Sequence, residues 1–220
     1  NKRFYTNFPT AEMLSSPLFA NLLFQIGMIE LVSYWKATCS PRVIIKGRKL
    51  SEEQVLWWKN VYYQGLGEFF YTNGITTDAG SFMQILSEGE TMLPQNISLD
   101  ETVIVPIGGG KDSVVTLELL ASTKKIRPFI MNPRGATLEC VRIAGFGNDG
   151  FIEVKRRIDP LLLELNAKGF LNGHTPFSAM LAFYSLLISA ISGHRHIALS
   201  NESSANEPTV SGTDVNHQYS

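Results

Sequence analysis

This chain has little cysteine, no excess of basic charge and no long apolar run, and each absence excludes a class of protein. Its two cysteines, Cys39 and Cys140, are too few for the disulfide framework of a small secreted domain, so we expect a cytoplasmic protein. The net charge is −1, which gives a nucleic-acid partner no electrostatic support. No uninterrupted apolar run is long enough to cross a bilayer, and no signal-peptide apolar region follows the N-terminus. We therefore expect no membrane partner either.

The remaining composition is that of a globular protein. Apolar residues make up 44% of the 220 residues and charged residues 18%, and a chain of this length can bury a sizeable core. The first residue is Asn1 instead of an initiating Met, and the last residues are polar. From the sequence we expect the chain to be cut from a longer protein at both ends.

Two regions with different patterns meet near residue 100. Residues 1–100 are expected to form a mostly helical accessory region. Its expected elements are helices over 18–37 and from Ser51 towards Phe69, and one short strand over 41–46, bounded by Gly47. Ser51 and Gln54 have the spacing of a capping box, which predicts the start of the second helix.

Residues 101–220 alternate strands with helices, which predicts an α/β domain with a doubly wound, mostly parallel sheet. The expected strands are 103–107, 126–131, 151–154 and 196–200, and the expected helices are 112–122, 136–144, one that begins at Pro160, and 175–191. Ligands of such sheets bind outside the carboxyl ends of the strands. The residues expected to bind a ligand are therefore 108–113, Asn132 with the residues up to 135, and those from 200 onward.

A glycine-rich turn between the first of these strands and its helix is the most informative feature of the chain. Gly108, Gly109 and Gly110 have no Cβ, so the backbone there can turn sharply and approach a ligand closely. The N–H groups of the first helical turn, the positive end of the helix dipole and Lys111 all favour an anion, most simply a phosphate. A glycine-rich connection that binds no ligand is the alternative interpretation.

Two common nucleotide-binding motifs do not fit this turn. A Walker A loop needs Gly where this chain has Val105, and Ser or Thr where it has Asp112. The dinucleotide fingerprint needs its third Gly where Ser113 stands. Residues 108–113 are instead similar to the PP-loop, S-G-G-x-D-S, of the N-type ATP pyrophosphatases, with Gly108 in place of the first Ser. That departure removes one hydroxyl donor but none of the backbone donors.

Two polar segments further along the chain carry candidate catalytic groups. His174 precedes Thr175, the expected N-cap of the long helix. It is either a group for substrate binding or proton transfer, or a neighbour of the cap that bonds only to backbone. Residues 199–220 follow the fourth expected strand and are rich in carboxylate, amide, imidazole and phenol groups. We interpret them as an active-site loop in preference to a solvated tail.

Four motifs together resemble the ATP-dependent UDP-N-acetylmuramoyl-L-alanyl-L-glutamate epimerase family of bacterial peptidoglycan synthesis. They are Pro106-Ile-Gly-Gly-Gly-Lys-Asp-Ser, Asn172-Gly-His-Thr-Pro-Phe-Ser, Ser200-Asn-Glu-Ser-Ser-Ala-Asn-Glu and Val215-Asn-His-Gln-Tyr-Ser. The resemblance covers the second half of the chain. It implies an adenine nucleotide alpha hydrolase-like fold, ATP as cosubstrate and Mg²⁺ as cofactor. In this family the last motif is expected to continue past Ser220.

The resemblance also implies a reaction in which ATP is split between its α and β phosphates. The α-carboxylate of the terminal L-Glu of UDP-MurNAc-L-Ala-L-Glu would attack the α-phosphate. The resulting acyl-adenylate withdraws electrons, so the neighbouring α-proton would become more acidic. Removal of that proton and its return from the other face would give D-Glu, and hydrolysis would release AMP.

Each candidate site residue has an expected role in this reaction. The groups expected to bind ATP are Gly108, Gly109, Gly110, Lys111, Asp112, Ser113 and Asn132. Asp112 would either hold Mg²⁺ through water or cap the helix. The candidates for proton transfer are His174, His217 and Glu202. The candidates for substrate binding are Asn201, Asn206, Asn216 and Tyr219.

Two other functions stay open at this point. The first is a PP-loop enzyme that modifies tRNA or a nucleoside, although the chain lacks the cysteine pair, zinc cluster or basic surface that such enzymes often carry. The second is a nucleotide-binding module that senses ATP without catalysis. Pyrophosphate release that depends on the muramoyl dipeptide would separate these functions from the epimerase.

Overall fold

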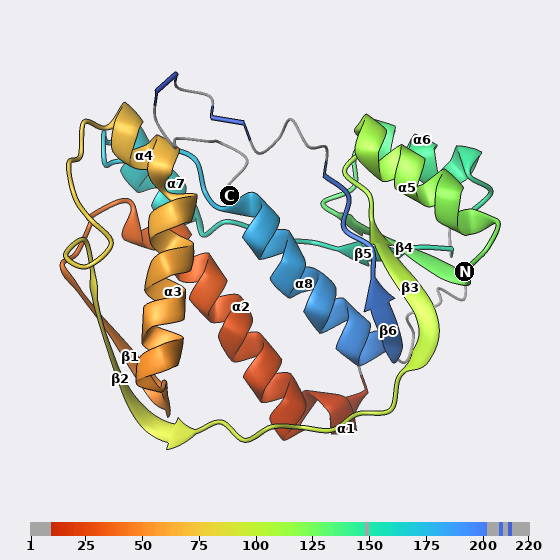
Figure 1. Ribbon diagram of the computed structural model, residues 1–220, viewed down its shortest axis with the longest axis horizontal. Helices are drawn as coiled ribbons and strands as arrows, with labels where there is room; N and C mark the ends of the chain where they lie inside the picture. Colours follow the sequence, from red (N-terminus) through yellow and green to blue (C-terminus); the bar gives the residue numbers. More distant parts are fainter. Residues whose placement is uncertain (1–9, 148–149, 202–206, 209–210, 213–220) are drawn as a thin grey trace. The chain divides into compact units, whose positions relative to one another are not determined.

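The computed structural model describes residues 10–147, 150–201, 207–208 and 211–212 (Figure 1). Its helices are α1 (Ala11–Leu14), α2 (Pro17–Trp35), α3 (Glu52–Gly65), α4 (Gly67–Thr72), α5 (Lys111–Ala121), α6 (Gly135–Ile143), α7 (Pro160–Ala167) and α8 (Phe177–Ser192). Its strands are β1 (Arg42–Lys49), β2 (Gln84–Thr91), β3 (Asp100–Pro106), β4 (Ile126–Met131), β5 (Ile152–Val154) and β6 (His194–Ile197). The α/β class expected from the sequence is confirmed.

The chain forms two compact units, each built from three stretches of sequence. The four-strand unit comprises residues 1–23, 95–157 and 181–202, and the two-strand unit comprises residues 24–94, 158–180 and 203–220. One crossing between the units, after Pro94, lies close to the division expected near residue 100. The other crossings differ from that simple division, because residues 158–180 belong with the two-strand unit.

The four-strand unit is built on a parallel sheet with the strand order β5-β4-β3-β6. β3 is rich in β-branched residues, and its central residues are buried on both faces of the sheet, which favours a strand in this position. Val105 packs with Leu117 of α5 and Val141 of α6 on one face. On the other face, Ile104 packs with Ile188 of α8. Helices therefore cover both faces, which is the arrangement of a doubly wound unit (Figure 1).

The strand order reverses at β3. From β3 the chain runs through α5 to β4 and through α6 to β5, each step moving in one direction across the sheet. It later places β6 on the opposite side of β3, where the amide of Ala198 donates a hydrogen bond of 2.9 Å to the carbonyl of Ile104. In doubly wound sheets the crevice at such a reversal, outside the carboxyl ends of the strands, is where ligands bind. The carboxyl ends of β3 and β6 are thus where a nucleotide is expected to bind.

The two-strand unit contains a small parallel sheet and an aromatic core. Trp35 and Phe69 both pack within the core, and the Trp35 ring lies edge-on to Phe82 with 5.7 Å between ring centroids. The predicted capping box of α3 is confirmed, since the amide of Gln54 donates to the Ser51 hydroxyl and the amide of Ser51 donates to the Gln54 side chain.

Three predictions for residues 1–100 are wrong. The strand β2 was not expected, and it pairs along its whole length with β1. Gly47 does not end the first strand, because it adopts a φ of +88° within β1 and pairs with Gly89, where a Cβ would collide with the Gly47 backbone. The second helix does not run unbroken towards Phe69, because α3 ends at Gly65 and a new helix begins at Gly67.

One helix among the described residues has the length and apolar composition to cross a membrane. This helix, α2, has a mean hydropathy of 1.3 over its most apolar stretch, a property that the sequence analysis missed. It contains Glu30, and Ile29 and Val32 are fully buried. The core helices of soluble proteins pass the same test, so this helix alone is only weak evidence of membrane contact.

Candidate functional site

The glycine turn, Gly108–Gly110, lies at the carboxyl end of β3 and leads directly into α5. The helix begins at Lys111 with Gly110 as its N-cap, in an extended conformation with φ −89° and ψ 171°. No side chain accepts a hydrogen bond at the cap, so the positive end of the helix dipole is available to a ligand. This is the geometry expected of an anion-binding turn.

A second helix N-terminus lies beside the same turn. Gly109 has a φ of +84°, and a Cβ built on it would lie 3.2 Å from Cγ2 of Thr137 and 3.5 Å from Cβ of Ala136. Both of these residues are in the first turn of α6. The Thr137 hydroxyl accepts a hydrogen bond of 2.9 Å from the amide of Arg134 and donates one of 2.9 Å to the carbonyl of the same residue. The positive ends of α5 and α6 therefore converge near Gly109, which strengthens the preference for an anion.

The structure shows the surroundings of two predicted ATP ligands in α5, Ser113 and Asp112. The Ser113 side chain is buried, and its hydroxyl donates a hydrogen bond of 3.0 Å to the carbonyl of Gly110, so it would have to turn away from this acceptor to reach a phosphate. Asp112 lies in the first helical turn and is not the helix cap, because Gly110 occupies the N-cap position. The capping alternative for Asp112 is therefore wrong, whereas its predicted contact with Mg²⁺ stays a prediction.

Asn132 follows β4 at the same edge of the sheet. It has a φ of +50°, and its amide donates a hydrogen bond of 2.8 Å to the carbonyl of Val154. Its side-chain oxygen accepts a hydrogen bond of 2.8 Å from the amide of Arg156. Asn132 thus ties the end of β4 to the chain leaving β5, and the contact with ATP expected for it stays a prediction.

A buried lysine that the sequence analysis did not single out holds the segment around His174. Lys36 is only 3% exposed, and its Nζ donates hydrogen bonds to the carbonyl of Gly173, to the carbonyl of His174 at 3.1 Å and to the hydroxyl of Thr175 at 2.7 Å. The prediction that Thr175 caps the following helix is wrong, because α8 begins two residues later, at Phe177. No local sequence pattern predicts that Lys36 is buried, because a lysine directly after an apolar helix is commonly exposed at the surface.

The remaining predicted site residues are only partly covered by the structure. Asn201 is described and exposed beyond the end of β6. His174 is half-buried and belongs to the two-strand unit, whereas the glycine turn belongs to the four-strand unit, and each unit is described by itself. The other predicted residues lie outside the described part of the chain: Glu202, Asn206, Asn216, His217 and Tyr219.

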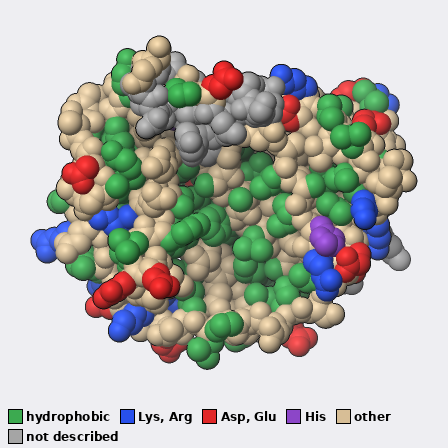
Figure 2. Space-filling model, in the orientation of Figure 1, with side chains coloured by type: hydrophobic (Ala, Val, Ile, Leu, Met, Phe, Trp, Pro, Cys, Tyr) green, Lys and Arg blue, Asp and Glu red, His purple; other side chains and the backbone are tan. Residues whose placement is uncertain are grey.

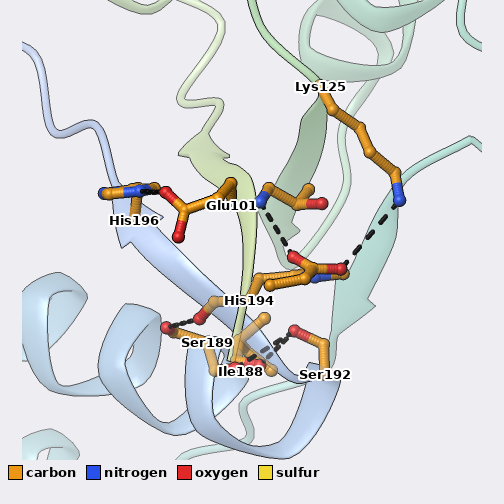
Figure 3. Close-up of polar contacts among 9 residues, drawn as sticks. Glu101, Lys125, Ile188, Ser189, Ser192, His194 and His196 are labelled. Carbon is orange, nitrogen blue, oxygen red and sulfur yellow. Dashed lines mark hydrogen bonds and ion pairs between the residues drawn. The ribbon is translucent and has the colours of Figure 1, made fainter. Parts of the chain in front are cut away.

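A charged cluster lies at the opposite, amino-terminal end of β3 (Figure 3). Nδ1 of His194 lies 3.0 Å from the carboxylate of Asp100, and Nε2 of His196 lies 2.8 Å from the carboxylate of Glu101. Arg195 adds an ion pair of 2.7 Å with Glu101. Figure 2 shows histidine, basic and acidic side chains gathered over β6. The cluster joins the first residues of β3 to β6, so it contributes to the alignment of the two strands. It lies at the other end of β3 from the glycine turn and is not part of the phosphate site.

The stability of the protein should fall between pH values of about 4 and about 2 through Asp100. The amide of Thr102 and the neighbouring His194 lower the pKa of Asp100 from its ordinary value of 3.8 to about 2. A carboxyl whose pKa is lower in the folded state stabilises the fold above its unfolded pKa, and this contribution disappears as the pH falls through the folded value. Asp100→Asn should therefore show a smaller loss of melting temperature between these pH values than the wild type, whereas Glu118→Gln on α5 should behave as the wild type. An unchanged acid profile in Asp100→Asn would contradict this assignment.

Comparison with known proteins gives the relationship that this geometry alone does not. Residues 3–220 match the MurL N-terminal domain family. Three curated relatives are each named UDP-N-acetyl-alpha-D-muramoyl-L-alanyl-L-glutamate epimerase. The protein from Salinispora tropica is 34% identical over 88% of this chain and 42% of its own length. The corresponding values are 31%, 86% and 42% for the Micromonospora protein, and 32%, 88% and 43% for the one from Xanthomonas oryzae pv. oryzae.

These matches define both the relationship and its extent. No solved structure matches the chain. The chain spans about two fifths of the length of the curated relatives that it matches. The match nevertheless extends over nearly every residue given, including both halves of the sequence. The chain therefore belongs to the MurL N-terminal domain family.

Proposed function

We propose that this chain is the N-terminal part of an ATP-dependent enzyme that converts the terminal L-Glu of UDP-MurNAc-L-Ala-L-Glu to D-Glu. The observation that carries the proposal is the match of residues 3–220 to a family whose relatives are named as epimerases of this dipeptide. The glycine turn between two helix N-termini supports the use of ATP. A reaction on a nucleotide-linked precursor that consumes ATP fits the cytoplasm, where we place the enzyme.

The proposed first step forms an acyl-adenylate. An oxygen of the L-Glu α-carboxylate attacks the α-phosphorus of ATP, and the bond from this phosphorus to the oxygen that bridges to the β-phosphate breaks, so that pyrophosphate leaves. The backbone N–H groups after the glycine turn and the ammonium of Lys111 would stabilise the negative charge on the phosphates. Because the start of α5 already orients the backbone N–H groups, little reorganisation of these groups is needed as charge develops.

Mg²⁺ would neutralise further phosphate charge, as it does in other enzymes that use ATP. The described residues contain no group of three or more His, Cys, Asp or Glu side chains that could hold a metal ion by themselves. Mg²⁺ in ATP sites is commonly held by one or two carboxylates together with the substrate phosphates and water. A single carboxylate, that of Asp112 in the first turn of α5, fits this requirement.

The second step inverts the glutamate α-carbon. A base takes the α-proton, which the adenylate has made more acidic, and an acid returns a proton to the opposite face. Water then attacks the acyl carbon, which releases AMP and the D-Glu carboxylate. We assign proton transfer to His174, His217 or Glu202, and binding of the substrate to Asn201, Asn206, Asn216 and Tyr219. Imidazole suits proton transfer near neutral pH.

Pyrophosphate release by the full-length enzyme tests this function. We expect release only when ATP and UDP-MurNAc-L-Ala-L-Glu are both present, with one AMP formed for each pyrophosphate. Two reactions serve as controls. The reaction without UDP-MurNAc-L-Ala-L-Glu measures hydrolysis of ATP in the absence of substrate, and the reaction with UDP-MurNAc-L-Ala-D-Glu in its place measures the reverse direction. Release that requires tRNA or a nucleoside would favour the modifying-enzyme alternative, and nucleotide binding without turnover would favour a sensor.

Replacement of Lys111 by Ala should weaken ATP binding about 10- to 100-fold, because a hydrogen bond to a charged group contributes about 1.5–3 kcal/mol. Lys111 is exposed at the first position of α5, where its ammonium can reach a phosphate on the glycine turn. Lys124→Ala is the matched control, since that lysine is exposed just beyond the other end of the helix. Calorimetric titration of the full-length enzyme with ATP measures both. Equal affinities in the two variants would remove Lys111 from the phosphate site.

A further inference from the structure

We propose that Lys36 is a positioning residue for His174, which it acts on by fixing the backbone of the segment 172–176. This inference rests on the proposed function, because it gives a role to a residue that serves the epimerase reaction. The residues that hold the segment are Lys36, which follows α2, Gly65 at the end of α3, Phe69 of α4 and Asn73, which follows α4. All four belong to the two-strand unit. Their contacts surround the backbone at His174 and restrict it.

The burial of Lys36 is the first observation. Lysine is almost never fully buried unless its ammonium is hydrogen-bonded, because removing the charge from water is unfavourable. Lys36 is 3% exposed and directs its hydrogen bonds to three consecutive residues: Gly173, His174 and Thr175. A buried ammonium that bonds backbone carbonyls fixes the orientation of those peptide groups, which sets the direction in which the His174 side chain leaves the chain.

The same segment is fixed from other sides. The side-chain amide of Asn73 donates a hydrogen bond of 3.2 Å to the carbonyl of Asn172. A Cβ on Gly65 would lie 2.5 Å from Cβ of Pro176, so the end of α3 is packed directly against the proline. A Cβ on Gly173 would lie 3.1 Å from the ring of Phe69. Loops are usually the mobile parts of a fold, whereas this one has a neighbour at almost every residue.

A purely structural role explains these contacts less well. An apolar side chain at position 36 would fill the same space without the cost of a buried charge, and such replacements of buried ionic groups are often neutral or stabilising. The hydrogen bonds of Lys36 converge on the two carbonyls next to the His174 side chain, and that side chain is only half-buried. A fixed backbone with a half-exposed imidazole is the requirement for a group that must meet a substrate in one geometry.

The test uses steady-state kinetics of the full-length enzyme with three variants: Lys36→Met, His174→Ala and the double variant. Lys36→Met keeps the length of the side chain but removes the charge. We expect it to lower kcat about 10²-fold, the effect of a displacement of about 1 Å in a reacting group, and to leave the Kd for ATP unchanged. The double variant should be no slower than His174→Ala, since residues that act through one another are not additive. Lys168→Met, at an exposed lysine that pairs with Glu164, is the control.

Additive losses in the double variant, or a wild-type kcat in Lys36→Met, would overturn the inference. If Lys36→Met does not fold, Thr175→Val decides, because it removes one acceptor of the ammonium and retains the lysine. It should lower kcat by about 10-fold with an altered dependence of kcat on pH, and a wild-type kcat and pH profile would reject the inference. A wild-type enzyme that releases no pyrophosphate with the dipeptide would instead reject the proposed function itself, and this inference with it.

Discussion

Gly110→Ala should weaken ATP binding at least about 10²-fold with only a small loss of melting temperature, whereas Gly109→Ala should lower the melting temperature more. Gly110 has an extended backbone that alanine can adopt, and a Cβ there would meet no atom within 4 Å. A methyl group at this position therefore has room in the protein and collides only with a ligand in the turn. We expect the affinity for ATP to fall by at least about 10²-fold, since phosphate contacts do not tolerate displacements of about 1 Å.

Gly109 provides the contrast within the same turn. Its φ of +84° strains any other residue by about 1–3 kcal/mol, and a Cβ would also press on Cγ2 of Thr137. Gly108→Ala is the matched control, because its Cβ also meets nothing within 4 Å and the PP-loop that these residues resemble has a serine, with its own Cβ, at this position. Thermal unfolding and calorimetric titration with ATP separate the two effects. Wild-type affinity in Gly110→Ala would mean that no phosphate approaches the turn, which would then serve only to connect β3 with α5.

His217→Ala should abolish epimerisation while ATP binding persists. The prediction rests on the sequence motif Val215-Asn-His-Gln-Tyr-Ser, since His217 lies outside the described residues. General acid–base groups contribute about 10² to 10⁴ in rate, so we expect a loss of that size in the exchange of the glutamate α-proton with solvent deuterium. The formation of AMP should fall less, because activation of the carboxylate precedes proton transfer.

His196→Ala is the matched control for this prediction, since its imidazole pairs with Glu101 at the amino-terminal end of β3, away from the glycine turn. It should retain wild-type exchange and AMP formation. The corresponding variants of His174 and Glu202 identify the base by the same measurements: the one that retains ATP binding and loses exchange takes the proton. An equal loss of ATP binding and epimerisation in a folded His217→Ala protein would remove His217 from proton transfer.

The parts of the fold that local sequence dictates were predictable. The bounds of β4 agree with the prediction, because its apolar residues end at Asn132 and Pro133, which break the strand. The glycine turn and the capping box at Ser51 were predictable for the same reason, since the residues that form each feature are neighbours in sequence. Their physical requirements, a missing Cβ or a hydroxyl three residues before an amide, are visible without the rest of the chain.

The features that depend on distant contacts were not predictable. β2 is rich in polar residues, and it is a strand because β1 lies beside it. α3 stops at Gly65, where Pro176, more than a hundred residues away in sequence, packs against the backbone. The burial of Lys36 likewise depends on residues 173–175. In each case the deciding partner comes from another stretch of chain, which no local periodicity reveals.

Transfer of oxygen from substrate to AMP tests the central claim, that ATP is spent to form an acyl-adenylate, most directly. The full-length enzyme would be given UDP-MurNAc-L-Ala-L-Glu with ¹⁸O in the α-carboxylate, and the AMP would be analysed by mass spectrometry. The proposed mechanism predicts one ¹⁸O atom in each AMP, because a carboxylate oxygen attacks the α-phosphorus and water later attacks the acyl carbon. AMP without ¹⁸O, formed together with D-Glu, would contradict it.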